Sequence, residues 1–132
     1  MYASARWHTA GRPIVYMAQS LSLAALEILV HLKQTRDVQP FRAFAAEVPD
    51  ALIQHAPGLP PRWHLRVEIS RAVGDAWLAE RSSPALLVPS AITPGEWNVL
   101  LNPTHPAFSL DWVITGPAIY RFDARLTGRG DD

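Results

Sequence analysis

The pattern of apolar and polar positions predicts one clear helix near the N-terminus. The thirteen residues that follow Ser20 contain neither glycine nor proline, and serine is a residue type that caps helix N-termini. On a helix, four polar residues of this region fall within about 60° of one another. They are Ser20, Glu27, His31 and Gln34. The opposite side is apolar, formed by Leu21, Ala25, Leu29 and Leu32.

Glu27 interrupts the apolar stretch 23–32 with a carboxylate. Burying an ionised carboxylate without partners costs several kcal/mol, so such a group either keeps one side in water or finds partners in a pocket. The helical spacing puts Glu27 in a narrow polar stripe, but it does not decide between bulk solvent and a cleft. Both interpretations stay open at this point.

The remaining pattern predicts strands more often than helices. A short buried strand at 14–16 runs into the first helix, and residues 40–49 alternate well enough for a second strand. Residues 55–63 carry three prolines and a glycine, which predicts a surface loop, and 70–81 is typical of a helix, although Gly74 weakens that prediction. Three further strands are expected, at 84–90, 96–103 and 118–126. A polar tail follows at 127–132.

This order of elements predicts an α+β fold. The late strands follow one another through connections too short for helical crossovers, so we expect mixed small sheets with flanking helices. The length of 132 residues fits one compact domain with a single sizeable core.

Composition and charge narrow the classes of function. Twelve basic residues balance twelve acidic ones, so no global field favours nucleic acid or an anionic membrane surface, and we expect neither as a partner. The absence of cysteine excludes disulfides and thiolate metal sites and fits a cytoplasmic protein. The longest apolar run is too short to cross a membrane.

Familiar catalytic motifs are missing from the sequence. The five histidines show no paired metal-ligand spacing, so no metal site is expected. No glycine-rich dinucleotide or nucleoside-triphosphate loop occurs, and no serine lies in a G-x-S-x-G elbow. Standard cofactor-binding and hydrolase signatures therefore offer no assignment.

A series of short motifs nevertheless spans residues 6–126. They are "ARW", "GRPIVYMAQSLSLAALEILVHL", "GDAWL", "LLVPSAI", "EWNVLLNPTHPAF" and "RFDARL". In this order and spacing they resemble the RES domain, the toxin half of bacterial RES-Xre toxin-antitoxin modules. The resemblance assigns residues 1–126 to a RES domain and leaves 127–132 as the tail.

The resemblance implies a fold similar to that of ADP-ribosyltransferase toxins and activity against NAD. RES proteins are described as NAD phosphorylases or glycohydrolases, and some as protein ADP-ribosyltransferases. NAD would be the substrate, inorganic phosphate a co-substrate, and no further cofactor is implied. The implied partner is an Xre-type antitoxin that covers the active site, in a complex that leaves room for a homo-oligomer of the toxin.

The resemblance also points to individual residues. The arginine, glutamate and serine for which the family is named correspond to Arg6, Glu27 and Ser90, and Tyr16 is a further family position. Glu27 would hold the nicotinamide ribose and stabilise positive charge at its anomeric carbon, and Arg6 would grip the pyrophosphate or a phosphate. Tyr16 would stack on the nicotinamide or bond the ribose, and Ser90 would orient the ribose or the amide. Without the resemblance, Tyr16 would be interpreted as a core strand residue and Ser90 as a turn cap.

Two differences from the family pattern bear on the expected activity against NAD. RES domains carry an upstream segment with another pocket arginine, which is not part of this sequence, and His8 replaces the usual asparagine after "RW". The alternatives are therefore a protein ADP-ribosyltransferase and a catalytically inactive, shortened RES domain that only binds antitoxin. Asn98 and Asn102 stay outside the expected catalytic set, because a turn before Pro103 explains Asn102 equally well.

Overall fold

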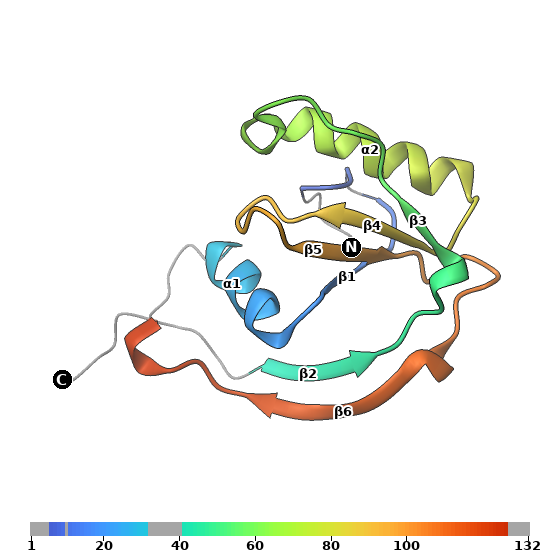
Figure 1. The fold of residues 1–132 in the computed structure, drawn as a ribbon. Coiled ribbons are helices and arrows are strands. Elements are labelled where there is room, and N and C mark those ends of the chain that lie inside the picture. The colour runs from blue at the N-terminus through green and yellow to red at the C-terminus, as the bar shows by residue number, and fades with distance from the viewer. Residues whose placement is uncertain (1–5, 10, 32–40, 127–132) are drawn as a thin grey trace. The chain divides into compact units, whose positions relative to one another are not determined.

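The computed structural model describes residues 6–9, 11–31 and 41–126 of the chain. Contacts between residues divide the chain into two units, which are described separately. The first unit contains Met1–Gln19 and Val48–Ser109, and the second contains Ser20–Glu47 and Leu110–Asp132. Both contain strands and one helix, so the predicted α+β class is confirmed (Figure 1).

The first unit is built on a four-stranded sheet with the order β1-β5-β4-β3. Its strands are β1 (Val15–Ala18), β3 (Ile53–His55), β4 (Ala85–Pro89) and β5 (Trp97–Leu101). The pairs β1–β5 and β4–β5 are antiparallel, whereas β3 and β4 are parallel. The strands predicted at 14–16, 84–90 and 96–103 are confirmed, but β3 and its parallel pairing were not predicted.

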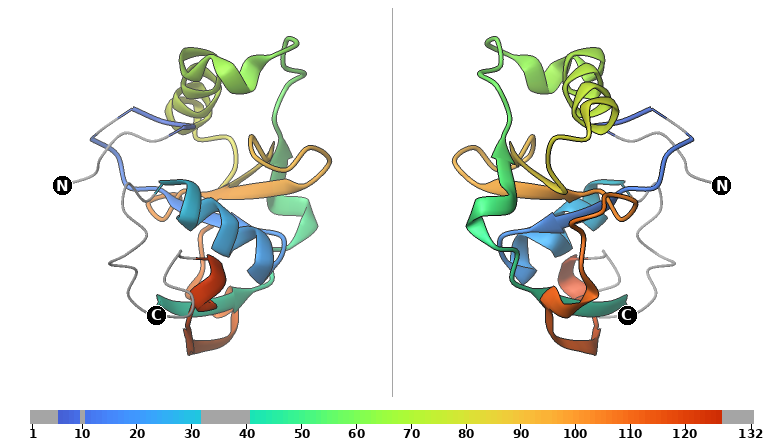
Figure 2. Two further views of the ribbon diagram at one scale, coloured as in Figure 1. Left: turned by 90° about the vertical axis from the view of Figure 1, so that its left-hand side faces the viewer. Right: turned by 90° about the vertical axis from the view of Figure 1, so that its right-hand side faces the viewer.

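Helix α2 (Val67–Glu80) connects β3 to β4 and covers one face of this sheet (Figures 1 and 2). It begins three residues before the predicted start at residue 70, and Arg81 closes it in a left-handed conformation with φ 54°. Between β3 and α2, residues 56–62 contain no helix or strand, as the prolines predicted, and a 3₁₀ turn follows at Trp63–Leu65. The helical crossover is what allows β3 and β4 to run parallel.

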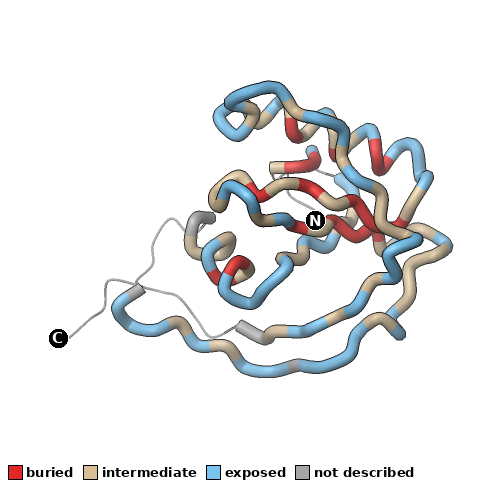
Figure 3. The backbone as a smooth tube through the Cα atoms, viewed as in Figure 1, coloured by how far each residue is buried: buried red, intermediate tan, exposed pale blue. Residues whose placement is uncertain are grey.

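The core of the first unit lies between α2 and the sheet. Buried residues gather along β4, β5 and the side of α2 that faces them (Figure 3). The cluster contains Trp7, Trp77, Leu78, Leu86, Val88 and Leu100. Because Trp7 belongs to it, the segment just before β1 is anchored in the core.

The second unit contains helix α1 (Leu21–His31) and the antiparallel strands β2 (Phe41–Ala46) and β6 (Val113–Tyr120). The predicted first helix and the strand within 40–49 are thus confirmed. Ser20 caps α1 as expected, since its Oγ accepts a hydrogen bond from the Leu23 backbone N–H at 3.1 Å.

The predicted strand at 118–126 was wrong over most of its length. Strand β6 begins earlier, at Val113, and ends at Tyr120, and Ala124–Leu126 form a 3₁₀ turn. The physical reason is Asp123, whose carboxylate accepts hydrogen bonds from the backbone and the guanidinium of Arg125 and so bends the chain out of the extended conformation. The tail at 127–132, Leu32 and Gln34 lie outside the described residues.

The described residues contain no helix that is both long and apolar enough to cross a membrane. Within the same residues, no three histidine or carboxylate side chains come together in the way that a metal ion requires.

Candidate functional site

The segment that begins at Arg6 is held along its length by α2. The Arg6 carbonyl accepts a hydrogen bond from the Ser70 hydroxyl, and the Thr9 backbone N–H donates to Asp75 Oδ1 at 2.9 Å. The half-buried guanidinium of Arg6 donates from Nη1 to the His64 carbonyl at 3.0 Å. Both the backbone and the side chain of Arg6 are therefore positioned by elements of the first unit.

Gly74 lets this segment lie directly against the helix. A Cβ atom at Gly74 would be 1.5 Å from the Trp7 carbonyl oxygen, so no larger residue fits without movement of the backbone. Trp7 is 2% exposed and its ring packs against Trp63, with the ring centroids 5.3 Å apart. The glycine that weakened the helix prediction is thus required by packing, and it explains the start of the "GDAWL" motif.

Tyr16 of β1 reaches back to the segment after Arg6. Its hydroxyl oxygen is 2.6 Å from Nδ1 of His8, which is itself only 3% exposed. A backbone hydrogen bond from Trp7 also reaches the phenol oxygen. Tyr16 and His8 therefore share a short hydrogen bond, in which the imidazole tautomer decides which group donates.

Burial of the hydroxyl raises the pKa of Tyr16 to about 12. The Trp7 hydrogen bond and the Arg71 charge act in the opposite direction, and Asp75 adds to the rise. The residue as a whole is 41% exposed, so the hydroxyl end is enclosed while much of the ring stays open. Tyr16 therefore offers an exposed aromatic surface and a neutral hydroxyl over the whole physiological pH range.

The raised pKa makes a prediction about pH and stability. Between pH 10.0 and about 12, an unfolded Tyr16 loses its proton while the folded one keeps it. The unfolded state then binds fewer protons, so the free energy of unfolding should fall as the pH rises through this window. Tyr16→Phe should remove that part of the slope, measured by urea unfolding at several pH values. A ¹³Cζ titration that shows Tyr16 ionising near pH 10.0 would contradict the enclosed hydroxyl.

Ser90 lies in the turn between β4 and β5. Its Oγ accepts hydrogen bonds from the backbone N–H groups of Ile92 and Thr93, at 3.2 and 3.1 Å, and its own N–H donates to the Glu96 carbonyl. The residue is 5% exposed. This geometry is that of a turn cap.

We expect Ser90→Ala to reduce stability. Two backbone N–H groups would lose their acceptor, which lowers the free energy of unfolding by about 1–3 kcal/mol, measured by urea unfolding. Ser22→Ala is the control, because Ser22 is exposed on α1. If Ser90 also contacts substrate, the KM for NAD will rise as well; stability equal to the wild type would refute the capping role.

Glu27 lies on α1 in the second unit, one helical turn after Leu23. Leu23 is 1% exposed, and Glu27 is half-buried. Residues four apart are neighbours on a helix surface, so the half-buried carboxylate lies beside a fully buried residue rather than on a fully solvated stripe. Leu21, which was expected on the core side, is 54% exposed, whereas Ala25 is buried as predicted. The side chain of His31 is not described.

The two asparagines of the "EWNVLLNP" motif are both buried. Asn98 is 8% exposed in β5, and Asn102 is 3% exposed directly after it. Asn102 Oδ1 accepts from both the backbone N–H and the hydroxyl of Thr104, which is the turn that Pro103 suggested.

The structure thus brings Tyr16 together with the residues that follow Arg6, and it places Ser90 in a turn of the same unit. Glu27 is positioned by the other unit. Sequence reasoning missed His8 as the partner of Tyr16. The signal was present, because His8 occupies the position at which the resembled family has asparagine, another side chain that can accept a hydrogen bond.

Comparison with known proteins agrees with the motifs. The family model "RES domain" matches residues 1–123. A protein of Pseudomonas putida named "Toxin Res" is 44% identical over 106 residues, which cover 78% of this chain and 73% of that protein.

Two further relatives extend this result. A "Toxin Res" of Yersinia enterocolitica is 35% identical over 92% of this chain and 82% of its own length. A "Prs ADP-ribosylating toxin" of a Sphingobium species is 39% identical over 76% of this chain and 67% of its own. The chain belongs to the RES domain family.

Proposed function

We propose that this protein is the toxin of a toxin-antitoxin module and that it consumes NAD by cleaving the bond between nicotinamide and ribose. ADP-ribose would pass to inorganic phosphate or to water, so that the enzyme is an NAD phosphorylase or glycohydrolase of the cytoplasm. Membership of the RES domain family and the toxin names of its relatives support this reaction class.

The observation that carries the proposal is the position of Glu27. Glu27 is a half-buried carboxylate in a mostly apolar helix, one turn after a fully buried leucine, and so it is partly shielded from bulk water. Glu27 is also the residue that corresponds to the glutamate of the family motif. Together these features favour a catalytic carboxylate over a surface charge.

The chemistry needs only one carboxylate. The nicotinamide nitrogen of NAD is cationic, so the leaving group departs as neutral nicotinamide with the electron pair of the C–N bond and requires no general acid. This differs from ordinary glycoside hydrolysis with its pair of carboxylates. Ionised Glu27 would hold the ribose hydroxyls and stabilise the positive charge that develops at the anomeric carbon while phosphate or water attacks there.

The family motif also names residues of the first unit, and each suits a part of NAD by its own chemistry. The Arg6 guanidinium donates from Nη1 to the His64 carbonyl and has further N–H groups that would bind a pyrophosphate or phosphate. Tyr16 presents the open part of its ring for stacking, and its hydroxyl is hydrogen-bonded to His8. Ser90 would orient the ribose or the amide through its hydroxyl group.

Analysis of the products tests the proposal. The purified protein is incubated with NAD labelled in the adenylate part, with and without inorganic phosphate. Free nicotinamide together with ADP-ribose or its 1''-phosphate is the expected result. No turnover at any phosphate concentration by folded protein that still binds an antitoxin would refute it in favour of a non-catalytic binding domain.

A second candidate function is transfer of ADP-ribose to a protein. The Sphingobium relative with its name of ADP-ribosylating toxin favours this reading. In the same experiment, label fixed to an added protein rather than released would support it. For either reaction we propose an Xre-type antitoxin as the partner, which would be expected to suppress turnover when added.

A further inference from the structure

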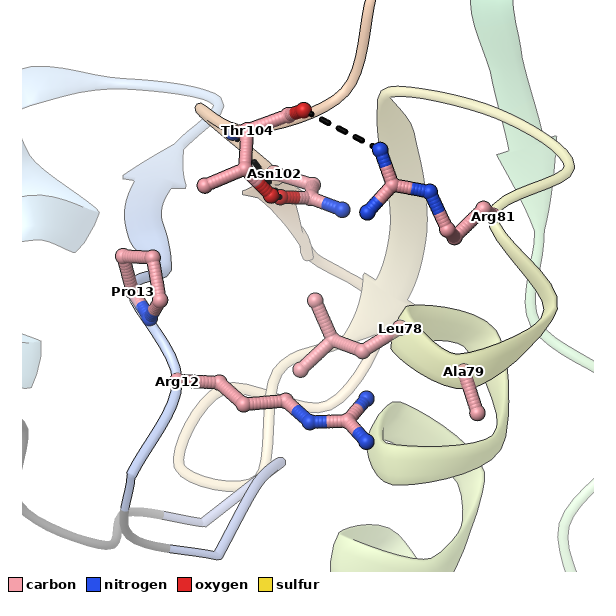
Figure 4. Close-up of a pocket in the computed structure, with 7 residues that line it drawn as sticks. All are labelled: Arg12, Pro13, Leu78, Ala79, Arg81, Asn102 and Thr104. Carbon is pink, nitrogen blue, oxygen red and sulfur yellow. Dashed lines mark hydrogen bonds between the residues drawn. The ribbon is translucent and has the colours of Figure 1, made fainter.

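A hollow in the first unit uses none of the residues assigned to NAD cleavage. It has a volume of about 300 Å³ and opens between the start of β1, the C-terminal end of α2 and the loop after β5 (Figure 4). Its lining residues are Arg12, Pro13, Leu78, Ala79, Arg81, Asn102 and Thr104. Two of these seven side chains are cationic and none is a carboxylate.

Asn102 aims an unused hydrogen-bond donor into this hollow. Its Oδ1 is committed to Thr104, at 3.0 Å from the backbone nitrogen and 2.7 Å from the hydroxyl, which fixes which end of the amide is oxygen. The amide nitrogen therefore points the other way, into the hollow (Figure 4). In the described part of the chain nothing accepts a hydrogen bond from it, although Asn102 is only 3% exposed. A ligand that supplies an acceptor in the hollow would therefore form a favourable hydrogen bond with the Asn102 amide N–H group.

The Arg81 guanidinium faces the same space. Its Nη2 donates to the Thr104 carbonyl at 3.2 Å, and the other terminal nitrogen lies on the side of the Asn102 amide (Figure 4). Helix α2 ends here, and the partial negative charge of its last carbonyls opposes anion binding. The Arg81 carbonyl is, however, bonded to His105 Nε2 at 2.9 Å, and the two guanidinium charges outweigh the half charge of a helix end.

Arg12 adds the second cation from the segment before β1. It is exposed, and among the described residues it makes no hydrogen bond or ion pair that would hold it elsewhere. Pro13 and Leu78 give the hollow an apolar wall between the two arginines. Guanidinium groups and an amide N–H₂ are the donors that phosphate oxygens prefer, and Arg can bind them in pairs.

We propose that this hollow binds a phosphoryl group, either as inorganic phosphate or as the phosphate of a small monoester whose organic part lies against Pro13 and Leu78. Arg12, Arg81 and Asn102 Nδ2 donate to the phosphate oxygens. A bound phosphate joins residues 12–13 to α2 and to the loop after β5, and so raises the thermal stability of the first unit by mass action.

The test is a titration of the full chain, in the absence of NAD, with inorganic phosphate and separately with ribose 5-phosphate. Sodium chloride at matched ionic strength controls for screening. The readout is the side-chain amide resonance of Asn102 in a ¹⁵N–¹H spectrum, which reports on this hollow and not on phosphate bound at the NAD-cleaving residues. We expect a saturable shift; a larger affinity for the ester would identify a phosphorylated metabolite as the source, and a larger affinity for the free ion would identify inorganic phosphate.

Substitutions then locate the binding. Arg12→Gln loses no hydrogen bond or ion pair to a described residue and should weaken binding by about tenfold or more, whereas Arg121→Gln, an exposed arginine of the second unit, should leave it unchanged. Asn102→Asp keeps the oxygen that Thr104 needs but replaces the donor with a negative charge. Because this variant has no side-chain amide to observe, its binding is read from the rise in Tm that phosphate produces, and that rise should be lost in a folded protein. A chloride response equal to that of phosphate, or phosphate binding unaffected by Arg12→Gln and Asn102→Asp, overturns the proposal.

Discussion

Glu27→Gln is expected to lower the rate of nicotinamide release by about a hundred- to a thousandfold or more. The substitution keeps the size of the side chain and one of its two acceptor oxygens, but it removes the charge that would stabilise the oxocarbenium-like transition state. Because Glu27 is half-buried, the fold should tolerate the neutral amide. The rate is measured by release of nicotinamide from NAD, and in cells by recovery of the NAD level and of growth.

Glu47→Gln is the matched control for this experiment. Glu47 is an exposed carboxylate of the same unit, and its backbone N–H donates a hydrogen bond to the Trp112 carbonyl. Its replacement should leave NAD cleavage unchanged. Full activity or full toxicity of Glu27→Gln would remove Glu27 from the catalytic assignment.

Gly74→Ala is expected to produce the largest loss of stability. In an exposed helix, alanine is about 1 kcal/mol better than glycine, so helix propensity alone predicts stabilisation. Here the added methyl would lie 1.5 Å from the Trp7 carbonyl oxygen, a backbone atom that cannot rotate away. The free energy of unfolding should therefore fall by about 1–3 kcal/mol or more, with the opposite sign to the propensity.

Urea unfolding of Gly74→Ala beside Gly58→Ala measures this effect. A Cβ at Gly58 meets nothing within 4 Å, and its backbone needs no left-handed conformation, so that variant should be close to neutral. Since the Trp7 segment also carries Arg6 and His8, we expect Gly74→Ala to reduce NAD cleavage as well. Equal or greater stability of Gly74→Ala would mean that the segment does not lie against α2 as described.

Local pattern was enough for the elements whose signals are local. Ser20 capping α1, the apolar run of β4 and the turn at Asn102 were all predictable, because each depends on residues a few positions apart. Strand β3 was not predicted, because Ile53–His55 is too short to show an alternation of apolar and polar residues. Its parallel pairing with β4 depends on the helix between them, which no local pattern reports.

The features of the site that the sequence did not predict depend on contacts between residues that are far apart in the sequence. Gly74 weakened the prediction of α2, yet its role is set by Trp7, which approaches from the other end of the unit. The spacing placed Glu27 in a polar stripe, but only the structure shows that Glu27 is half-buried and lies one turn after the fully buried Leu23. The hydrogen bond between His8 and Tyr16 could not be predicted either, because it depends on where β1 lies relative to the segment before it.

The pairing of strands distant in sequence has a consequence for how the chain acquires its structure during synthesis. Val15 of β1 pairs with Leu101 of β5, and Phe41 of β2 pairs with Tyr120 of β6. These long loops must close, at a cost in chain entropy, before the strand contacts that stabilise them can form. Folding is therefore slow compared with that of helical proteins of the same size. The first sheet cannot be completed on the ribosome until β5 has emerged, nor the second until β6 has emerged, so the unit that carries Glu27 cannot acquire its native strand pairing before Tyr120 has been synthesised.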